Sequence, residues 1–220
     1  MSPTQTLSST EVAPRLHALA PERLPFAPSL EIRSFLLQRA RGNVLIYSSR
    51  GLAEGADELE RLGGVSRRYL NHWHEAMFAS ELAGAPLFVH ERDRPRVAED
   101  LRVRGTFSRR HTLDDDLEVI PTPGHTEGAT AYLWDSGTER ILFTGDTVYL
   151  REGEWAAAVL ASSDRDAYLR SLELIRGLEF DLLAPWAGTA GGPLAVPTDS
   201  GDARRRLDAI IERLRGGSDH

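Results

Sequence analysis

Apolar positions along the chain fall into short runs separated by turn residues, and a few stretches show helical spacing. Short apolar runs predict strands, which we expect at 32–38, 44–47, 65–71, 86–90, 117–120 and 180–184. Apolar residues that recur every three or four positions predict helices at 52–62, 75–82, 94–101, 164–178 and 202–214. Asp164 stands at the expected N-cap of the fourth helix. Strands and helices intermixed in this way predict an α/β or α+β layered domain.

A hairpin is predicted near the middle of the chain. Residues 129–134 and 140–144 have the pattern of two strands, joined by the turn residues Asp135-Ser136-Gly137-Thr138. Because a hairpin returns the chain to its starting point, we expect His125 and Asp146 at the same open end. A histidine and a carboxylate placed together are candidate metal ligands or an acid–base pair. A surface histidine and a turn aspartate would give the same pattern.

Both ends of the chain are predicted to lie outside the folded body. Residues 1–28 are rich in Ser, Thr and Pro and carry a short helical pattern at 12–19, so we expect a poorly ordered or draped arm. Residues 29–215 are expected to form a single domain, and residues 216–220 a flexible tail.

The composition restricts the chemistry. The net charge of −7 argues against a nucleic-acid partner, and every basic residue is an arginine, so we attribute the arginine clusters to a compositional bias. The sequence has no cysteine, so a metal site must use histidines and carboxylates, which suit zinc, iron or manganese. No secretory signal and no apolar run of membrane-spanning length is visible, so we expect a cytoplasmic protein without a membrane partner.

His72 and His74 form the second informative feature. They follow a predicted strand, and side chains two positions apart in extended chain project to the same side, so both imidazoles could reach one metal ion. Two surface histidines are the simpler explanation of this pair alone. Together with His125 and Asp146 further along the chain, the pair predicts a metal site.

Four segments in this order resemble the metallo-β-lactamase-fold hydrolases, the superfamily that includes glyoxalase II and lactonase-like proteins. The family's motifs read His-x-His-x-Asp-His, Pro-Gly-His-Thr with a following Gly, Thr/Ser-Gly-Asp and Pro-Gly-His-Gly. The matching segments are His72-Trp73-His74-Glu75-Ala76-Met77, Pro123-Gly124-His125-Thr126 with Gly128, Thr144-Gly145-Asp146, and Pro185-Trp186-Ala187-Gly188. The resemblance implies a four-layer αββα sandwich, with helices outside two facing sheets and the metal site at one sheet edge.

The resemblance also assigns ligands. His72, His74 and His125 match the three histidines of the family's first metal, and Asp146 matches the carboxylate that bridges both metals. The remaining ligands of the second metal are replaced by apolar residues, namely Ala76, Met77 and Ala187. The resemblance therefore implies one divalent metal, with zinc first and iron or manganese as alternatives.

The implied function is hydrolysis of a small ester, thioester, lactone or amide by a metal-activated water, with Asp146 as fourth ligand or partner of the water. One alternative is a non-catalytic binding or scaffold protein that keeps the fold with a decayed site. Another is a homo-oligomer in which a second subunit completes the site.

Three residues beside the ligands are candidates for a substrate pocket. Trp73 and Trp186 flank positions that would face the metal cleft, and their rings would fill the volume of the second ion, line a pocket or simply pack. Glu75 is expected to cap the following helix, or to replace the missing acid of the second site. The run Asp114-Asp115-Asp116 predicts a solvated loop, with calcium binding as an alternative.

Overall fold

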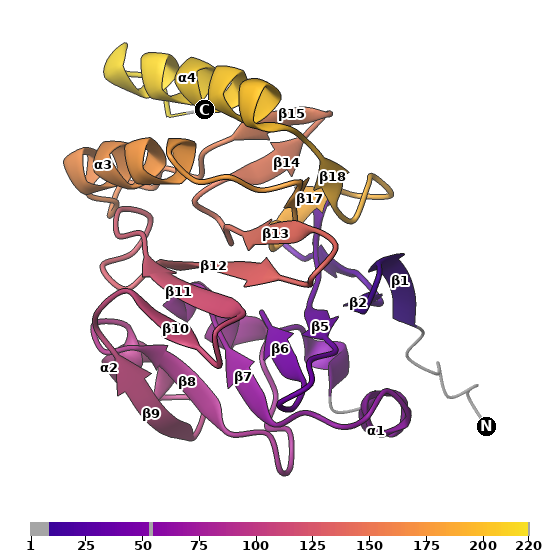
Figure 1. The fold of residues 1–220 in the computed structure, drawn as a ribbon. Coiled ribbons are helices and arrows are strands. Elements are labelled where there is room, and N and C mark those ends of the chain that lie inside the picture. The colour runs from indigo at the N-terminus through magenta and orange to yellow at the C-terminus, as the bar shows by residue number, and fades with distance from the viewer. Residues whose placement is uncertain (1–8, 53–54, 220) are drawn as a thin grey trace.

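The computed structural model describes residues 9–52 and 55–219, and its centre is a pair of β-sheets that face each other (Figure 1). The first sheet has the strand order β1-β2-β5-β6-β7-β8-β9. Its strands are β1 (Ser9–Ala13), β2 (Leu16–Leu19), β5 (Phe35–Leu37), β6 (Val44–Ile46), β7 (Arg67–Tyr69), β8 (Leu87–His90) and β9 (Val103–Phe107).

The facing layer is built from two further sets of strands. One has the order β10-β11-β12-β13-β16-β18, and the other β15-β14-β17-β4-β3. The first set comprises β10 (His111–Leu113), β11 (Leu117–Pro121), β12 (Thr130–Asp135), β13 (Arg140–Phe143), β16 (Leu182–Leu183) and β18 (Val196–Pro197). The second comprises β3 (Glu22–Leu24), β4 (Ala27–Ile32), β14 (Tyr149–Arg151), β15 (Glu154–Ala156) and β17 (Ala187–Thr189).

The inner core lies between these layers. Phe35 and Ile46 of the first sheet belong to the same buried cluster as Tyr132 and Phe143 of the facing sheet. Leu36 and Leu45, the neighbours that point to the other face, belong to a separate cluster with Leu52 and Leu59. Alternate residues of the strands therefore fill an inner and an outer core, as the period of two requires.

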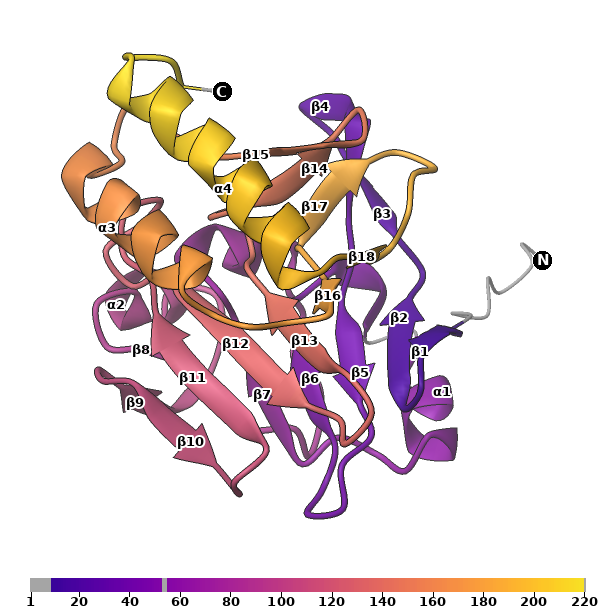
Figure 2. The same ribbon diagram turned by 45° about the horizontal axis from the view of Figure 1, so that its top comes forward.

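Helices cover both outer faces, which completes the four-layer αββα sandwich. The 3₁₀ turn η1 (Arg50–Leu52) and α1 (Ala56–Arg61) cover the first sheet near β5 and β6, and the 3₁₀ turn η2 (Trp73–Phe78) and α2 (Arg94–Val97) cover it near β7 and β8. The longer helices α3 (Arg165–Arg176) and α4 (Ser200–Arg215) lie side by side over the facing sheet (Figure 2). Asp164 caps α3 as predicted, because its side chain accepts a hydrogen bond from Ala167 N at 2.9 Å.

The N-terminal segment differs from the prediction. Residues 9–28 are not a draped arm and contain no helix at 12–19, because they supply β1, β2, β3 and the start of β4. Leu16 and Leu19 are fully buried, and β2 pairs with β5 in the first sheet. The burial of these side chains on both faces of β2 stabilises a strand where the sequence alone suggested a helix. The first eight residues of the predicted arm lie outside the described residues.

Two further elements are shorter than predicted. The helical pattern at 75–82 forms the 3₁₀ turn η2, and the helix expected at 94–101 ends at Val97. The predicted hairpin is present as β12 and β13, paired antiparallel from Tyr132–Phe143 to Asp135–Arg140.

The triple aspartate is engaged by an arginine. Buried Arg39 donates hydrogen bonds to Asp114 and Asp116. These ion pairs give the run a structural role. Within the described residues, no helix is both long and apolar enough to cross a membrane.

Candidate metal centre

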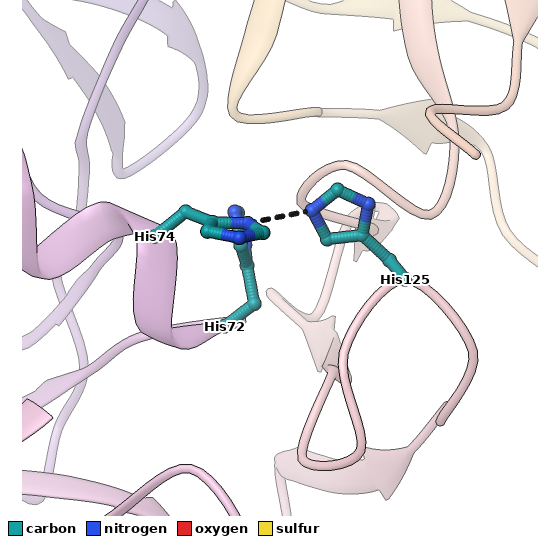
Figure 3. Close-up of side chains that lie close together, drawn as sticks. All are labelled: His72, His74 and His125. Carbon is teal, nitrogen blue, oxygen red and sulfur yellow. Dashed lines mark hydrogen bonds between the residues drawn. The ribbon is translucent and has the colours of Figure 1, made fainter. Parts of the chain in front are cut away.

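Three histidines from two separate segments meet at one end of the sandwich (Figure 3). His72 follows β7 in an extended conformation, and His74 lies in the first turn of η2. His125 belongs to the loop between β11 and β12. Each offers one ring nitrogen, and these nitrogens all lie within 4.8 Å of one another. The closest pair is His74 Nδ1 and His125 Nε2, at 3.0 Å.

Asp146 joins the cluster from the loop after β13. Its Oδ2 lies 3.6 Å from His72 Nε2 and 3.7 Å from His125 Nε2. The hairpin therefore brings His125 and Asp146 together at its open end, where the sequence predicted them. Within the described residues, Asp146 Oδ1 is buried and has no hydrogen-bond partner.

Hydrogen bonds on the far sides of two rings leave their other nitrogens available. His72 Nδ1 lies 2.9 Å from Asn71 Oδ1, and His125 Nδ1 lies 2.6 Å from the carbonyl oxygen of Ala158. An acceptor at Nδ1 requires the proton there, so Nε2 of both rings carries a lone pair toward the cluster. His72 Nε2 is buried, and nothing in the described part of the chain forms a hydrogen bond with it.

This donor set fits a divalent metal. A buried nitrogen without a partner is costly, and a bound ion would satisfy both His72 Nε2 and the carboxylate of Asp146. Imidazole nitrogens and carboxylate oxygens are ligands that zinc takes, and an open zinc site has three protein ligands and a water in the fourth position. The arrangement of these residues therefore suits a divalent metal ion.

Burial favours the neutral form of two of the imidazoles, those of His72 and His74. Burial lowers the pKa of His72 well below its ordinary value, and the neighbouring His125 and His74 lower it further. Burial, followed by the charge of His125, lowers the pKa of His74 to about 4. Burial raises the pKa of Asp146, an effect that His125 opposes. Neutral imidazoles are the form that binds a metal, so the lowered pKa values of His72 and His74 favour metal binding at neutral pH.

A buried carboxylate connects the two histidine segments. Asp93 Oδ2 accepts hydrogen bonds from Trp73 N at 2.9 Å and Thr126 Oγ1 at 2.8 Å, and its Oδ1 accepts one from Gly128 N at 2.9 Å. Asp93 occupies the N-cap position of α2 but does not cap that helix with its side chain. It instead fixes the backbone between His72 and His74 against the loop that carries His125.

Two motif glycines are required by close packing. A Cβ on Gly145 would lie 1.9 Å from Asn71 Cγ, and a Cβ on Gly124 would lie 2.4 Å from the Cα of Tyr168. Both glycines also have positive φ angles, 56° and 143°. The absence of a side chain at these positions lets the His125 and Asp146 loops approach the rest of the site.

Glu75 caps the turn that carries His74 and does not enter the site. It is fully buried, and its carboxylate accepts hydrogen bonds from the backbone N–H groups of Asn71, His72 and Ser48. The capping role expected from the sequence is therefore present, on a 3₁₀ turn. The same donors hold its carboxylate against the backbone, and Glu75 is not among the residues that line the cavity beside the histidines.

The two tryptophans differ in position. Trp186 lines the cavity beside the site, contacts the His72 ring at a centroid distance of 5.2 Å and donates a hydrogen bond to Ser48 O. Trp73 contacts the His74 ring at a centroid distance of 3.9 Å, with the two rings tilted by 53°. The guanidinium carbon of Arg96 lies over the Trp73 ring, 5.6 Å from its centroid. Trp73 is not among the residues that line the cavity, so its ring packs against His74 and forms no part of the cavity wall.

A cavity of about 340 Å³ opens beside the histidines. Its polar residues include His74, His125 and Asp146 at one end, and the remaining lining is largely apolar. A concave apolar space with a few converging polar groups is the usual form of a small-molecule site.

Sequence reasoning missed Asn71, Asp93 and the carbonyl of Ala158. Asn71 adjoins the histidine motif at the end of a strand, which is a signal that could have been used. Asp93 lies twenty residues from Trp73 and thirty-three from Thr126. Such separations give no local pattern.

Comparisons with known proteins point to one superfamily. The family model described as "Metallo-beta-lactamase superfamily" matches residues 53–187. An uncharacterised protein of Mycobacterium leprae is 27% identical over 140 residues, a match that covers 52% of this chain and 62% of that protein. The chain thus spans less than two thirds of the length of this curated relative.

Solved structures show the same fold at low identity. A metallo-beta-lactamase from Pontibacter korlensis is 18% identical, with a TM-score of 0.68, over 96% of this chain and 99% of that one. The metallo-beta-lactamase FIM-1 from Pseudomonas aeruginosa, in a mono-zinc form, is 11% identical, with a TM-score of 0.74, over 96% of each chain.

Proposed function

Because the chain belongs to the metallo-beta-lactamase superfamily, whose model matches more than half of it, we propose that it is a metal-dependent hydrolase with a mononuclear site. His72, His74 and His125 would hold the ion, and Asp146 would be the fourth ligand or the partner of a water. The observation that carries this proposal is the buried Nε2 of His72, which has no partner among the described residues although the opposite side of its ring is held by Asn71.

The residues of the site suit hydrolysis of a carbonyl compound. A divalent ion held there would act as a Lewis acid and lower the pKa of a coordinated water toward neutrality. Asp146 Oδ2 lies between His72 and His125, and its Oδ1 is free of protein partners within the described chain, so it can accept a hydrogen bond or a proton from a water. Asn71 and Ala158 keep the imidazoles in the tautomers that present Nε2. Zinc suits three nitrogens and one oxygen, with iron or manganese as alternatives.

The three positions of the second metal support a single ion. Ala76 is buried in an apolar cluster beneath η2, whereas Met77 and Ala187 line the cavity. Neither an alanine nor a thioether is a suitable ligand for a hard or borderline divalent ion. Glu75 does not compensate, because its carboxylate is engaged by backbone N–H groups.

The missing second-site ligands also favour one other function, a non-catalytic binding or scaffold protein. That function would be supported by a cleft filled by Trp73, Met77 and Trp186. The structure instead retains a cavity of about 340 Å³, with Trp186 and Met77 in its walls and Trp73 outside its lining. The substrate we propose is a small ester, thioester, lactone or amide. The cytoplasmic location and a homo-oligomeric state stay predictions from the sequence.

Metal content tests the proposal directly. Elemental mass spectrometry of the purified protein, after reconstitution with zinc, iron or manganese, is expected to show about one ion per chain. The His125→Ala variant should lose the ion, whereas His111→Ala, an exposed histidine of β10, should keep it. Two ions per chain would contradict the mononuclear site. No ion after reconstitution would leave the scaffold function standing.

A further inference from the structure

The cavity beside the histidines has walls from several distant segments. Leu24, Phe26 and Leu30 come from β3, β4 and the turn between them, Met77 and Phe78 from η2, and Leu160 from the loop before α3. Phe26 and Phe78 are in ring contact, with centroids 6.3 Å apart. The wall is therefore a continuous apolar surface that begins at the metal ligands.

The rim of this cavity is apolar and exposed. In the described part of the chain, the large apolar side chains that stand exposed are Phe26 at 72%, Met77 at 51% and Leu160 at 42%. All three line this one cavity. Exposed apolar side chains gathered in one place mark a binding surface, because elsewhere on the protein such side chains are buried.

The charged groups of the cavity disfavour a ligand that carries a carboxylate away from the histidines. No arginine is among its lining residues in the described chain, and the sequence has no lysine. Asp146 is the carboxylate of the lining. Arg50 lies over the outer side of Phe78 at 5.0 Å and is paired with Glu22 at 3.4 Å. A carboxylate at the end of a ligand that lies against Phe26 and Leu160, away from the histidines, would lose its hydration without gaining a cationic side chain.

We propose, on the basis of the proposed function, that the substrate is a neutral ester or lactone whose acyl chain is apolar and lies in this cavity. In its hydrolysis, water adds its oxygen to the acyl carbon, the acyl C–O bond breaks, and the alkoxy oxygen takes a proton to leave as the alcohol. The carboxylic acid so formed ionises and releases a second proton.

A series of p-nitrophenyl esters tests the chain preference on the zinc-loaded protein. From acetate through butyrate and hexanoate, kcat/KM is expected to rise about fourfold for each added methylene until the cavity is full. The hemisuccinate, which carries a terminal carboxylate on a chain as long as butyrate, should be at least about tenfold slower than butyrate.

Variants of the rim connect the preference to this cavity. Phe26→Ser and Leu160→Ser should lower the ratio of kcat/KM for hexanoate to that for acetate by about fourfold or more, since each removes the apolar surface that a methylene or more would cover. Both side chains are exposed, so the fold should be retained. Leu174→Ser is the matched control, because this half-buried leucine of α3 does not line the cavity and should leave the ratio unchanged.

A binding measurement separates this inference from the proposed function. In titration calorimetry with the metal-free protein, the neutral 2-octanone should bind, and octanoate should bind at least about tenfold more weakly. The Phe26→Ser variant should have a lower affinity for 2-octanone. Binding of the ketone without turnover of any ester would contradict the proposed hydrolase function and support the inference that the cavity binds apolar ligands. Turnover without chain-length dependence, or a preference for the hemisuccinate, would overturn the apolar substrate and support the hydrolase. A dimer that dissociates in Phe26→Ser, with no ketone bound, would assign the rim to a second copy and overturn the inference.

Discussion

Asp93 provides the sharpest test of how this fold positions its candidate metal ligands. Its carboxylate is 4% exposed and accepts three hydrogen bonds from the two loops that carry the histidines. In Asp93→Asn one oxygen becomes an amide NH₂, which cannot accept. The least costly orientation keeps an oxygen toward Trp73 N and Thr126 Oγ1 and turns the NH₂ toward the N–H of Gly128.

The magnitude follows from that one lost acceptor. The backbone N–H of Gly128 is buried, and a buried donor without a partner costs about 1–3 kcal/mol. Loss of the charge weakens the other two bonds. The weakening of these bonds is partly offset, because a neutral side chain avoids the cost of burying an ionised carboxylate. Burial raises the pKa of Asp93, which is the direction expected from that cost. We therefore expect the free energy of unfolding of the metal-free protein to fall by about 1–3 kcal/mol.

The effect on the metal distinguishes positioning from simple stability. Residues that orient metal ligands typically change affinity by about 10–100-fold when they are replaced. We expect Asp93→Asn to weaken zinc binding by this factor in a competition assay with a chelating indicator at pH 7. Its unfolding would be followed in urea in parallel.

A matched control separates the two effects. Asp181 accepts a hydrogen bond from Arg140 N at 2.8 Å, is exposed and lies away from the histidines. Asp181→Ala removes this acceptor and should lower the free energy of unfolding without changing zinc affinity. If the zinc affinity of Asp93→Asn is within about threefold of that of the unchanged protein while its stability falls as expected, Asp93 only stabilises the fold. That result would refute the argument that Asp93 positions the histidines.

Three further changes test other parts of the site. Gly145→Ala should reduce both stability and zinc affinity, as measured by urea unfolding and indicator competition, because its Cβ would meet Asn71; normal binding would refute this packing argument. Asp164→Ala should lower the free energy of unfolding in urea by about 1 kcal/mol through loss of the cap on α3, with zinc affinity as the internal control. For His74 the pKa falls from 6.5 unfolded to about 4 folded, so the unfolded chain binds more protons between these values. Metal-free stability in urea should be full above about pH 6.5 and decline toward pH 4, and His74→Gln should make this decline shallower; an equal decline in both proteins would contradict the assignment.

The ligand cluster was predictable because its determinants are local. His72 and His74 are two residues apart, and the hairpin of β12 and β13 returns Asp146 to the end where His125 begins. Short-range periodicity and turn chemistry carry that information. The same holds for α3, whose N-cap at Asp164 stands directly before a regular apolar face.

The N-terminal strands were not predictable for a physical reason. All four residues of β2 are buried, including His17, whose Nε2 lies 2.8 Å from Gln38 Oε1. A strand covered on both faces shows no alternation of apolar and polar residues. Its stability comes from pairing with β5 and β1, which the residues of 16–19 do not reveal by themselves. Asp93 escaped prediction for the same reason, because its partners are distant in sequence.

The apolar residues at the positions that the resemblance assigns to a second metal and the apolar cavity are better explained together than apart. Two of the three positions that the resemblance assigns to the second ion, Met77 and Ala187, lie in the cavity wall beside His74 and Asp146. Decay of a metal site would remove ligands without requiring that apolar surface continue outward from them. Here Met77 extends the apolar surface from the histidines to an exposed rim that includes Phe26. On the proposed function, residues that would have held a second ion now form the wall against which an apolar acyl chain would lie.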